Sequence, residues 1–440
     1  MGTVFDDHES AVRSYSRSWP VVFDGARDGR LYAEDGTPYV DFFCGAGALN
    51  YGHNHPLIKE ALLRYLADDR VIHSLDMSTV AKEEFLERFW AVALKPRALD
   101  YKVQFTGPTG TNAVEAALKL ARKVTGRDLV VGFTNAFHGM TLGALSVTGN
   151  AMKRGGAGVP LNHSASVPFC NFLEDDVDSI EIFRALIEGS GSGMDLPAAV
   201  IVETVQGEGG INVASVPWLR KVADLCAEHG ILLVVDDVQM GCGRTGPFFS
   251  FEDAGIVPDI VTMAKSLSGI GLPLAVTLMR PDLDVWQPGE HNGTFRGNNP
   301  AFVTATAALG LWEDGGMADR TVALGAMVEE RLGVLAAEVA DRCPGLPVEV
   351  RGKGLVWGLA FPGADLAPAV CRAAFERGLL VETSGPDDDV VKIMPPLTAS
   401  ADEELAPGLE TLGLAVRAVL DDRAPGAGPA DGSGAVGTRR

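Results

Sequence analysis

Two carboxylates end a run of apolar residues in the middle of this 440-residue chain. Residues 231–235 are all apolar, and Asp236 and Asp237 follow them directly. A carboxylate at the end of a buried strand is costly unless a positive group compensates it. Side chains alternate along a strand, so only one acid can face such a group. We assign that role to Asp236 and a structural role to Asp237.

Lys265 ends another mostly apolar run, 29 positions after Asp236 (265 minus 236). If both runs are neighbouring parallel strands, their polar ends meet at the same edge of a sheet, where ligands bind. A lysine amine in apolar surroundings can lose its proton and act as a nucleophile. The alternative is a lysine that simply extends into solvent, as most do.

A Gly- and Thr-rich loop, TGPTGT at 106–111, runs into a helical pattern. Free backbone N–H groups at a helix start suit a phosphate, as do the hydroxyls of Thr109 and Thr111. Nucleotide binding is disfavoured, because neither a Gly-Lys-Ser/Thr sequence nor GxGxxG is present. The alternative is an ordinary capped helix. A phosphate loop, a strand-end lysine and a strand-end carboxylate together match what pyridoxal phosphate requires.

The elements that must position these residues alternate between short apolar runs and longer amphipathic stretches. Helices are predicted at 112–126 and 216–230, each ending at a glycine. This alternation predicts an α/β fold with a mainly parallel central sheet and helices on both faces. The predicted strands lie within 101–107, 128–135, 198–205, 231–237 and 259–266.

The chain divides into four predicted parts. Residues 1–55 contain hairpin spacing with Asp-Gly turns and are expected to join a smaller domain. Residues 56–318 form the large cofactor-binding domain, and residues 319–422 form that smaller α+β domain. The Gly- and Pro-rich residues 423–440 are expected to be disordered.

Composition restricts the class of partner. The net charge is -21, which disfavours nucleic-acid binding. Six cysteines without a CxxC pair are typical of reduced thiols in a cytoplasmic protein. The polar N-terminus and the absence of an apolar run of about 18 residues predict neither a signal peptide nor a membrane span. His53 and His55 are close, but no further ligands accompany them, so no metal is expected.

The segment DDVQMGCGRTGPFFSFEDAGIVPDIVTMAKSL resembles the class III pyridoxal-phosphate aminotransferases of fold type I. The resemblance extends over about residues 15–420. It implies that Lys265 binds the cofactor covalently and moves protons, and that Asp236 pairs with the pyridinium nitrogen. Val238 would pack on the cofactor ring, and Gln239 would reach its phenolic oxygen. Glu203 would lie just outside the residues that contact the cofactor.

The same resemblance implies further contacts to the cofactor 5'-phosphate and ring. Gly110 and Thr111 would hold the phosphate, together with Thr294 donated by a partner subunit. Phe137 would stack on the ring, with His138 beside it. The family therefore implies a homodimer, or a higher homo-oligomer, with shared active sites.

Four other segments narrow the substrate: RSYSRSWPVVFDGARDG, DFFCGAGALNYGHNHP, HSLDMSTVAK and GEHNGTFRGNNPAFVTA. They resemble the branch of the family that serves ectoine synthesis. This implies amino transfer from glutamate to the aldehyde carbon of L-aspartate 4-semialdehyde, giving 2-oxoglutarate and L-2,4-diaminobutyrate. The alternatives are transfer from another terminal amine (ornithine, 4-aminobutyrate or a diamine), or an aminomutase or epimerase reaction.

Three residues are predicted to contact the substrates. In VVKIMPPL, Lys392 stands where many relatives have an arginine that pairs with the glutamate of QGEGG, here Glu208, and binds the α-carboxylate of glutamate. Lysine lacks the bidentate fork of arginine, so we expect a softer gate. The alternative is a surface lysine. Tyr51 is a further candidate, for the distal end of the semialdehyde.

Overall fold

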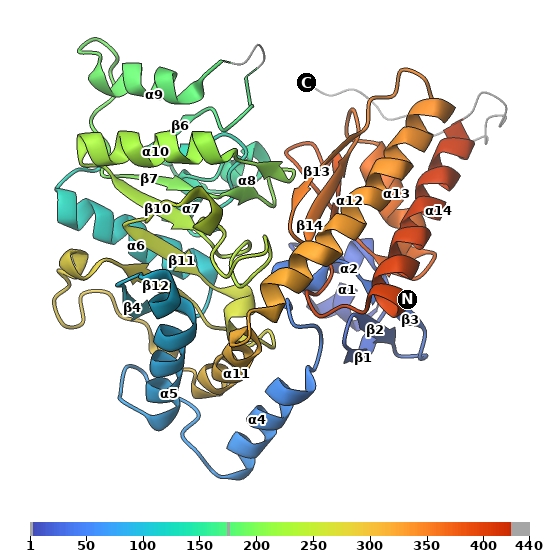
Figure 1. Cartoon of the computed structure of the whole chain (residues 1–440), viewed down its shortest axis with the longest axis horizontal. Helices are drawn as coiled ribbons and strands as arrows, with labels where there is room; N and C mark the ends of the chain where they lie inside the picture. The colour runs from blue at the N-terminus through green and yellow to red at the C-terminus, as the bar shows by residue number, and fades with distance from the viewer. Residues whose placement is uncertain (1–2, 174–176, 424–440) are drawn as a thin grey trace.

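The computed structural model describes residues 3–173 and 177–423, and a seven-stranded sheet lies at its centre (Figure 1). The strand order is β4-β12-β11-β10-β7-β5-β6. All strands run parallel except β12, which is antiparallel to both neighbours. The prediction of a mainly parallel sheet is confirmed, although it did not include β6 and β12. The strands are β4 (Lys102–Phe105), β5 (Val130–Phe133), β6 (Ser164–Val167), β7 (Ala199–Val202), β10 (Leu232–Asp236), β11 (Ile260–Met263) and β12 (Val276–Met279).

Alternate residues of β10 enter two different hydrophobic cores, one on each face of the sheet. Val234 packs with α6 (Gly110–Thr125), and Val235 packs with α10 (Val216–His229). Both strand faces are therefore covered, which explains why β7 and β10 are buried along their whole length. Each helix ends at a glycine with positive φ, Gly126 or Gly230, as the sequence predicts.

A helical group at the lower edge of the sheet in Figure 1 consists of α4 (Pro56–Ala67), α5 (Val80–Phe89) and α11 (Asn299–Leu309). The helix α11 packs against both of the others. Shorter elements complete this part of the chain: α7 (Leu142–Ser146), α8 (Ala151–Gly155), α9 (Ser179–Glu188), β8 (Val205–Gln206) and β9 (Asn212–Val213).

A second sheet, drawn at the right of Figure 1, is antiparallel with the order β13-β14-β17-β16. Its strands are β13 (Glu349–Lys353), β14 (Val356–Ala360), β17 (Val390–Ile393) and β16 (Glu382–Ser384). The accompanying helices are α12 (Gly316–Arg342), α13 (Leu366–Phe375) and α14 (Ala406–Arg423). Residues 424–440, most of the predicted tail, lie outside the described part of the chain.

A third sheet joins the two ends of the chain. The hairpin strands β1 (Phe23–Arg27), β2 (Arg30–Ala33) and β3 (Pro38–Asp41) pair antiparallel, with Asp-Gly pairs at both turns. The strand β15 (Leu379–Leu380) adds in parallel to β3. The N-terminal segment therefore packs with C-terminal elements, whereas the domain boundaries at 55, 318 and 422 remain predictions.

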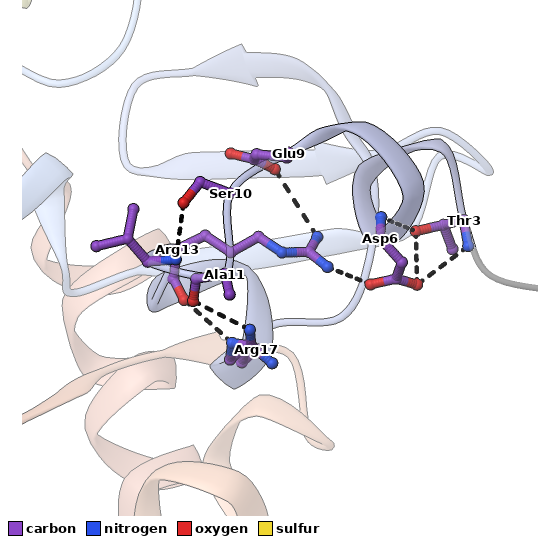
Figure 2. Close-up of polar contacts among 8 residues, drawn as sticks. Thr3, Asp6, Glu9, Ser10, Ala11, Arg13 and Arg17 are labelled. Carbon is purple, nitrogen blue, oxygen red and sulfur yellow. Dashed lines mark hydrogen bonds and ion pairs between the residues drawn. The ribbon is translucent and has the colours of Figure 1, made fainter.

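The first residues form two short helices, α1 (Val4–His8) and α2 (Tyr15–Ser18), which their own polar contacts hold together (Figure 2). The Arg13 guanidinium pairs with Asp6 and Glu9, and Arg17 donates to the carbonyl of Ala11. Among the helices of the described residues, none combines the length and the apolar character needed to cross a bilayer.

Candidate active site

A cavity of about 460 Å³ opens where β10 and β11 end and α6 begins. Ten of the predicted site residues line it: Gly110, Thr111, Phe137, His138, Glu203, Glu208, Asp236, Val238, Gln239 and Lys265. The structure thus brings together residues from six segments of the large sheet and its loops. Thr294, Lys392 and Tyr51 do not line this cavity.

Lys265 is placed in the cavity wall by the end of β11. Its backbone has a φ of 51°, in the left-handed region that a lysine rarely adopts. Burial lowers the pKa of Lys265, and the negative charge of Glu208 opposes this shift only in part. The amine is therefore easier to deprotonate than that of a surface lysine, as a nucleophile requires.

Asp236 is fixed by hydrogen bonds to both of its carboxylate oxygens. Its Oδ2 atom lies 2.7 Å from Nδ1 of His138, and its Oδ1 atom accepts from the hydroxyl of Thr262 at 3.0 Å. Burial lowers the pKa of His138, but the hydrogen bond and charge of Asp236 outweigh it, so the net shift is upward. This contact favours the protonated imidazole and holds the Asp236 carboxylate in place.

Thr262 is a site residue that the sequence analysis missed. It is the register partner of Asp236 across the β10–β11 pair, so its side chain lies on the same side of the sheet. The signal was present in the sequence, because aligning the two apolar runs in parallel sets Thr262 opposite Asp236. The sequence did not specify the register of these two strands, which the structure provides.

Glu203 and Asp237 are buried acids on either side of this carboxylate. Glu203 Oε2 accepts from the backbone N–H of Phe137 at 3.0 Å, and burial and the neighbouring acids raise its pKa to about 8. Asp237 is outside the cavity and accepts from the N–H of Ser250 at 3.2 Å. Burial raises its pKa to about 7.

The start of α6 forms the end of the cavity predicted to hold a phosphate. The first backbone N–H groups of a helix lack intrahelical acceptors, and here they belong to Gly110 and Thr111. A Cβ atom at Gly110 would come within 2.7 Å of Val238 Cγ1, so a side chain there would push Val238 out of place. The glycine keeps this end of the cavity open.

The hydroxyl of Thr111 is already engaged. Thr141 donates its hydroxyl proton to Glu115 Oε1 at 2.6 Å, so the 2.6 Å contact between Thr111 and Thr141 requires Thr111 to donate. In this arrangement Thr111 offers a phosphate its backbone N–H rather than its hydroxyl.

Glu208 stands at the cavity wall with a cation behind it. Its Oε1 atom lies 2.8 Å from Nζ of Lys392 and accepts from the Gln239 amide at 3.1 Å. Burial raises the pKa of Glu208, but the charges of Lys392 and Lys265 outweigh it and hold the pKa well below its usual range. The pairing of Glu208 with Lys392 is therefore present. The surface alternative for Lys392 is wrong, because this residue is fully buried.

A second carboxylate on Lys392 was not predicted. Glu382 Oε1 lies 2.7 Å from the same Nζ atom, and Glu382 is the register partner of Lys392 in the antiparallel β16–β17 pair. Opposed residues of such a pair share one face of the sheet. The sequence signal was the hairpin register of residues 379–385 and 390–397, which places the two charges opposite each other.

Two predicted residues lie away from the cavity. Tyr51 is buried in the main hydrophobic core, where its hydroxyl accepts from Trp312 Nε1 at 2.8 Å. The predicted substrate contact of the Tyr51 side chain is therefore wrong, because a phenol ring among apolar residues packs better there than in a wet loop. Thr294 is exposed and does not line the cavity, so its contact with the phosphate in a partner subunit stays a prediction.

Sequence comparison relates the chain to known enzymes over nearly its whole length. Residues 12–416 match the family model described as aminotransferase class-III. A diaminobutyrate–2-oxoglutarate transaminase of Streptomyces anulatus is 59% identical over 416 residues, which cover 94% of this chain and 97% of the relative. The enzyme of the same name from Streptomyces coelicolor is 60% identical over 418 residues, again 94% and 97% of the two chains.

The three-dimensional comparison agrees. The ornithine aminotransferase of Toxoplasma gondii superposes with a TM-score of 0.80 at 28% identity, covering 95% of this chain and 94% of that one. The cavity at the carboxyl ends of a mainly parallel sheet and this superposition define the α/β architecture of fold type I. Within that architecture, the chain belongs to the class III aminotransferase family.

Proposed function

We propose that the chain transfers an amino group between glutamate and the terminal carbon of L-aspartate 4-semialdehyde, forming 2-oxoglutarate and L-2,4-diaminobutyrate. The observation that carries the substrate assignment is the 59–60% identity to transaminases named for this pair. The superposed ornithine aminotransferase is only 28% identical. The 59–60% identity, which extends over 94% of this chain, favours the diaminobutyrate reaction over transfer from another terminal amine.

Pyridoxal 5'-phosphate is the proposed cofactor, and the cavity residues fit it. The start of α6, kept open by Gly110, suits the phosphate, and the fixed anion Asp236 suits a protonated ring nitrogen. Lys265 supplies a primary amine in the same cavity. In a structure of the Toxoplasma gondii enzyme, this cofactor is present at the active site at partial occupancy.

The bound cofactor would supply an electron-withdrawing ring that stabilises negative charge on the reacting carbon. Lys265 would hold the cofactor covalently, yield that position to the substrate amine, and then remove the proton from the reacting carbon. Asp236, held by His138 and Thr262, would keep the ring nitrogen protonated. Phe137 and Val238 would pack against the two faces of the cofactor ring, and Gln239 would approach its phenolic oxygen.

The two substrates place different demands on Glu208. Glutamate carries an α-carboxylate on the reacting carbon, and we propose that this group replaces Glu208 on Lys392 when glutamate binds. The semialdehyde and diaminobutyrate carry no carboxylate on the reacting carbon, and their α-ammonium and α-carboxylate groups are both at the remote end. Glu208 can therefore stay on Lys392 and attract the ammonium group. Unchanged glutamate kinetics in a Lys392→Ala variant would remove the first role.

We further propose a cytoplasmic homodimer in which Thr294 reaches the phosphate of the neighbouring subunit. Exposed apolar side chains support such an interface, among them Leu57, Leu63 and Leu66 on α4 and Phe295 beside Thr294. Ectoine synthesis is the pathway that we propose for the product, because the sequence segments resemble that branch of the family.

An absorbance spectrum of the purified protein tests the function directly. We expect a visible cofactor band that bleaches with glutamate and returns when aspartate semialdehyde is added. Bleaching without recovery would keep the aminotransferase and reject the acceptor in favour of another terminal amine or aldehyde. The absence of a band after adding pyridoxal phosphate would overturn the cofactor.

A further inference from the structure

The ammonium group of Lys392 lies between two carboxylates that come from different parts of the fold. Glu208, in the loop between β8 and β9, contacts it at 2.8 Å, and Glu382, on β16, contacts it at 2.7 Å. On the other side of β17, the register partner of Lys392 is Gly358, which has no side chain to contribute. One buried cation thus serves two acids.

The two acids differ in what else surrounds them. Glu208 lines the cavity and also contacts Gln239, so a molecule in the cavity can reach it. Glu382 does not line the cavity and is 9% exposed. It is fixed by the strand pairing of β16 with β17. One carboxylate of the cluster is therefore accessible to substrates, and the other is part of the sheet.

Tyr15 of the N-terminal segment lies close to this cluster. Burial raises the pKa of Tyr15 above its usual range, and the nearby carboxylates Glu382 and Glu208 raise it further. The ring of Tyr15 stacks on Trp19 and packs against Phe43. The contacts drawn in Figure 2 hold the chain that leads into α2, the helix that carries Tyr15. Glu382 therefore has Lys392 and the N-terminal Tyr15 as neighbours, and it is itself almost fully buried.

We propose that Glu382 is a positioning residue for the glutamate half-reaction: it keeps Lys392 charged and in place while the Glu208 carboxylate gives way to a substrate carboxylate. A buried ammonium group without a carboxylate partner is strongly unfavourable. With Glu382 present, Lys392 retains one ion pair throughout the exchange. Before glutamate binds, Lys392 pairs with Glu208 and Glu382. Afterwards it would pair with Glu382 and the substrate carboxylate.

This inference rests on the proposed function, because it needs one substrate with a carboxylate on the reacting carbon, which displaces Glu208 from Lys392, and one without, which leaves Glu208 in place. Glutamate requires the exchange, whereas diaminobutyrate can react with Glu208 still paired. Loss of the Glu382 charge should therefore affect one half-reaction and spare the other. A purely structural role would weaken both.

The test uses the holoenzyme in single-turnover experiments that follow cofactor absorbance with each amino donor separately. For Glu382→Gln we expect the apparent Kd for glutamate to rise about tenfold or more, and the apparent Kd for diaminobutyrate to change less than about twofold. Glu382→Asp retains the charge on a side chain one methylene shorter and should recover much of the glutamate affinity. Glu349→Gln, an exposed carboxylate of the same sheet, is the matched control.

A Glu208→Gln variant separates the two acids. It leaves the Lys392–Glu382 pair intact and removes the group that must be displaced, so glutamate affinity should not fall. Three results would each overturn the role of Glu382. Glu382→Gln could weaken the binding of both donors equally, or of neither. The Asp and Gln variants could also show the same apparent Kd for glutamate. Failure of the wild-type protein to bleach with glutamate is a distinct result, which would overturn the proposed function instead.

Discussion

The imidazole Nδ1 atom of His138 lies 2.7 Å from Oδ2 of Asp236, and neither side chain is more than 5% exposed. The other oxygen of Asp236 accepts from Thr262 and from the N–H of Val238. With both oxygens held, the carboxylate cannot rotate away from the cavity. The hydrogen bond and charge of Asp236 raise the pKa of His138, which favours the protonated imidazole. Asp236 is therefore a carboxylate of fixed orientation, and its surroundings lead to the following predictions.

Replacement of Lys265 by alanine should abolish multiple-turnover transamination, because the covalent attachment and the proton-transferring amine are lost together. The measurement is steady-state formation of 2-oxoglutarate from glutamate and the semialdehyde. Lys221→Ala, which removes an exposed lysine paired with Asp178, serves as the control and should remain active. Sustained turnover by Lys265→Ala would reject the assignment of the catalytic lysine.

Asp236→Asn should slow proton removal from glutamate by at least about 100-fold while the protein remains folded. The amide keeps the size of the carboxylate but not the charge that holds a proton on the ring nitrogen. Single-turnover rates with protiated and α-deuterated glutamate would isolate this step. Asp282→Asn, at an exposed acid, provides the comparison. A variant with wild-type rates would show that Asp236 has no electrostatic role.

Glu203 should make the protein less stable as the pH rises. Burial raises its pKa from 4.5 to about 8, so between these values the folded state keeps a proton that the unfolded state has lost. The free energy of unfolding then falls by up to about 1.4 kcal/mol per pH unit in this window. Glu203→Gln cannot titrate, so its thermal midpoint should fall less between about pH 5 and pH 8. Parallel curves for both proteins would contradict the shift.

Lys392→Met should destabilise the protein by about 3–5 kcal/mol, because it leaves two buried carboxylates without a cation. Adding Glu208→Gln and Glu382→Gln to this variant should recover most of the loss, since no buried charge is then unpaired. Thermal midpoints of the wild type, Lys392→Met and the triple variant measure both effects. A triple variant no more stable than Lys392→Met would indicate that packing, not charge, dominates at this position.

Subunit mixing should reveal whether Thr294 acts across an interface. Lys265→Ala and Thr294→Ala homodimers should both have low activity, the second through weaker cofactor binding. In a mixed dimer the two changes fall on the same site if Thr294 acts in trans, which leaves the other site intact. Co-refolded mixtures should then regain activity. If each subunit supplies its own Thr294, mixing should give no gain.

The local pattern of the sequence was sufficient to predict the strands that lead to Asp236 and Lys265. It also predicted the two helices that end at Gly126 and Gly230. Buried parallel strands must be apolar throughout, and a helix commonly ends at a glycine with positive φ, so both leave a signature in neighbouring residues. The motif around Asp236 and Lys265 was specific enough to indicate the family. These features depend on residues that are close in the chain.

Features that depend on register or on long-range packing were decided by the tertiary structure. Thr262 faces Asp236, and Glu382 faces Lys392, because two strand pairs align in one of several registers that the sequence alone allows. Tyr51 has a suitable polar group in a promising loop, but packing of the whole core determines that its hydroxyl meets Trp312. The sequence by itself thus determined the chemistry of the lysine and carboxylate. Only the folded chain decided which charges share a face, because a side chain's partners are set by the segments that fold against it.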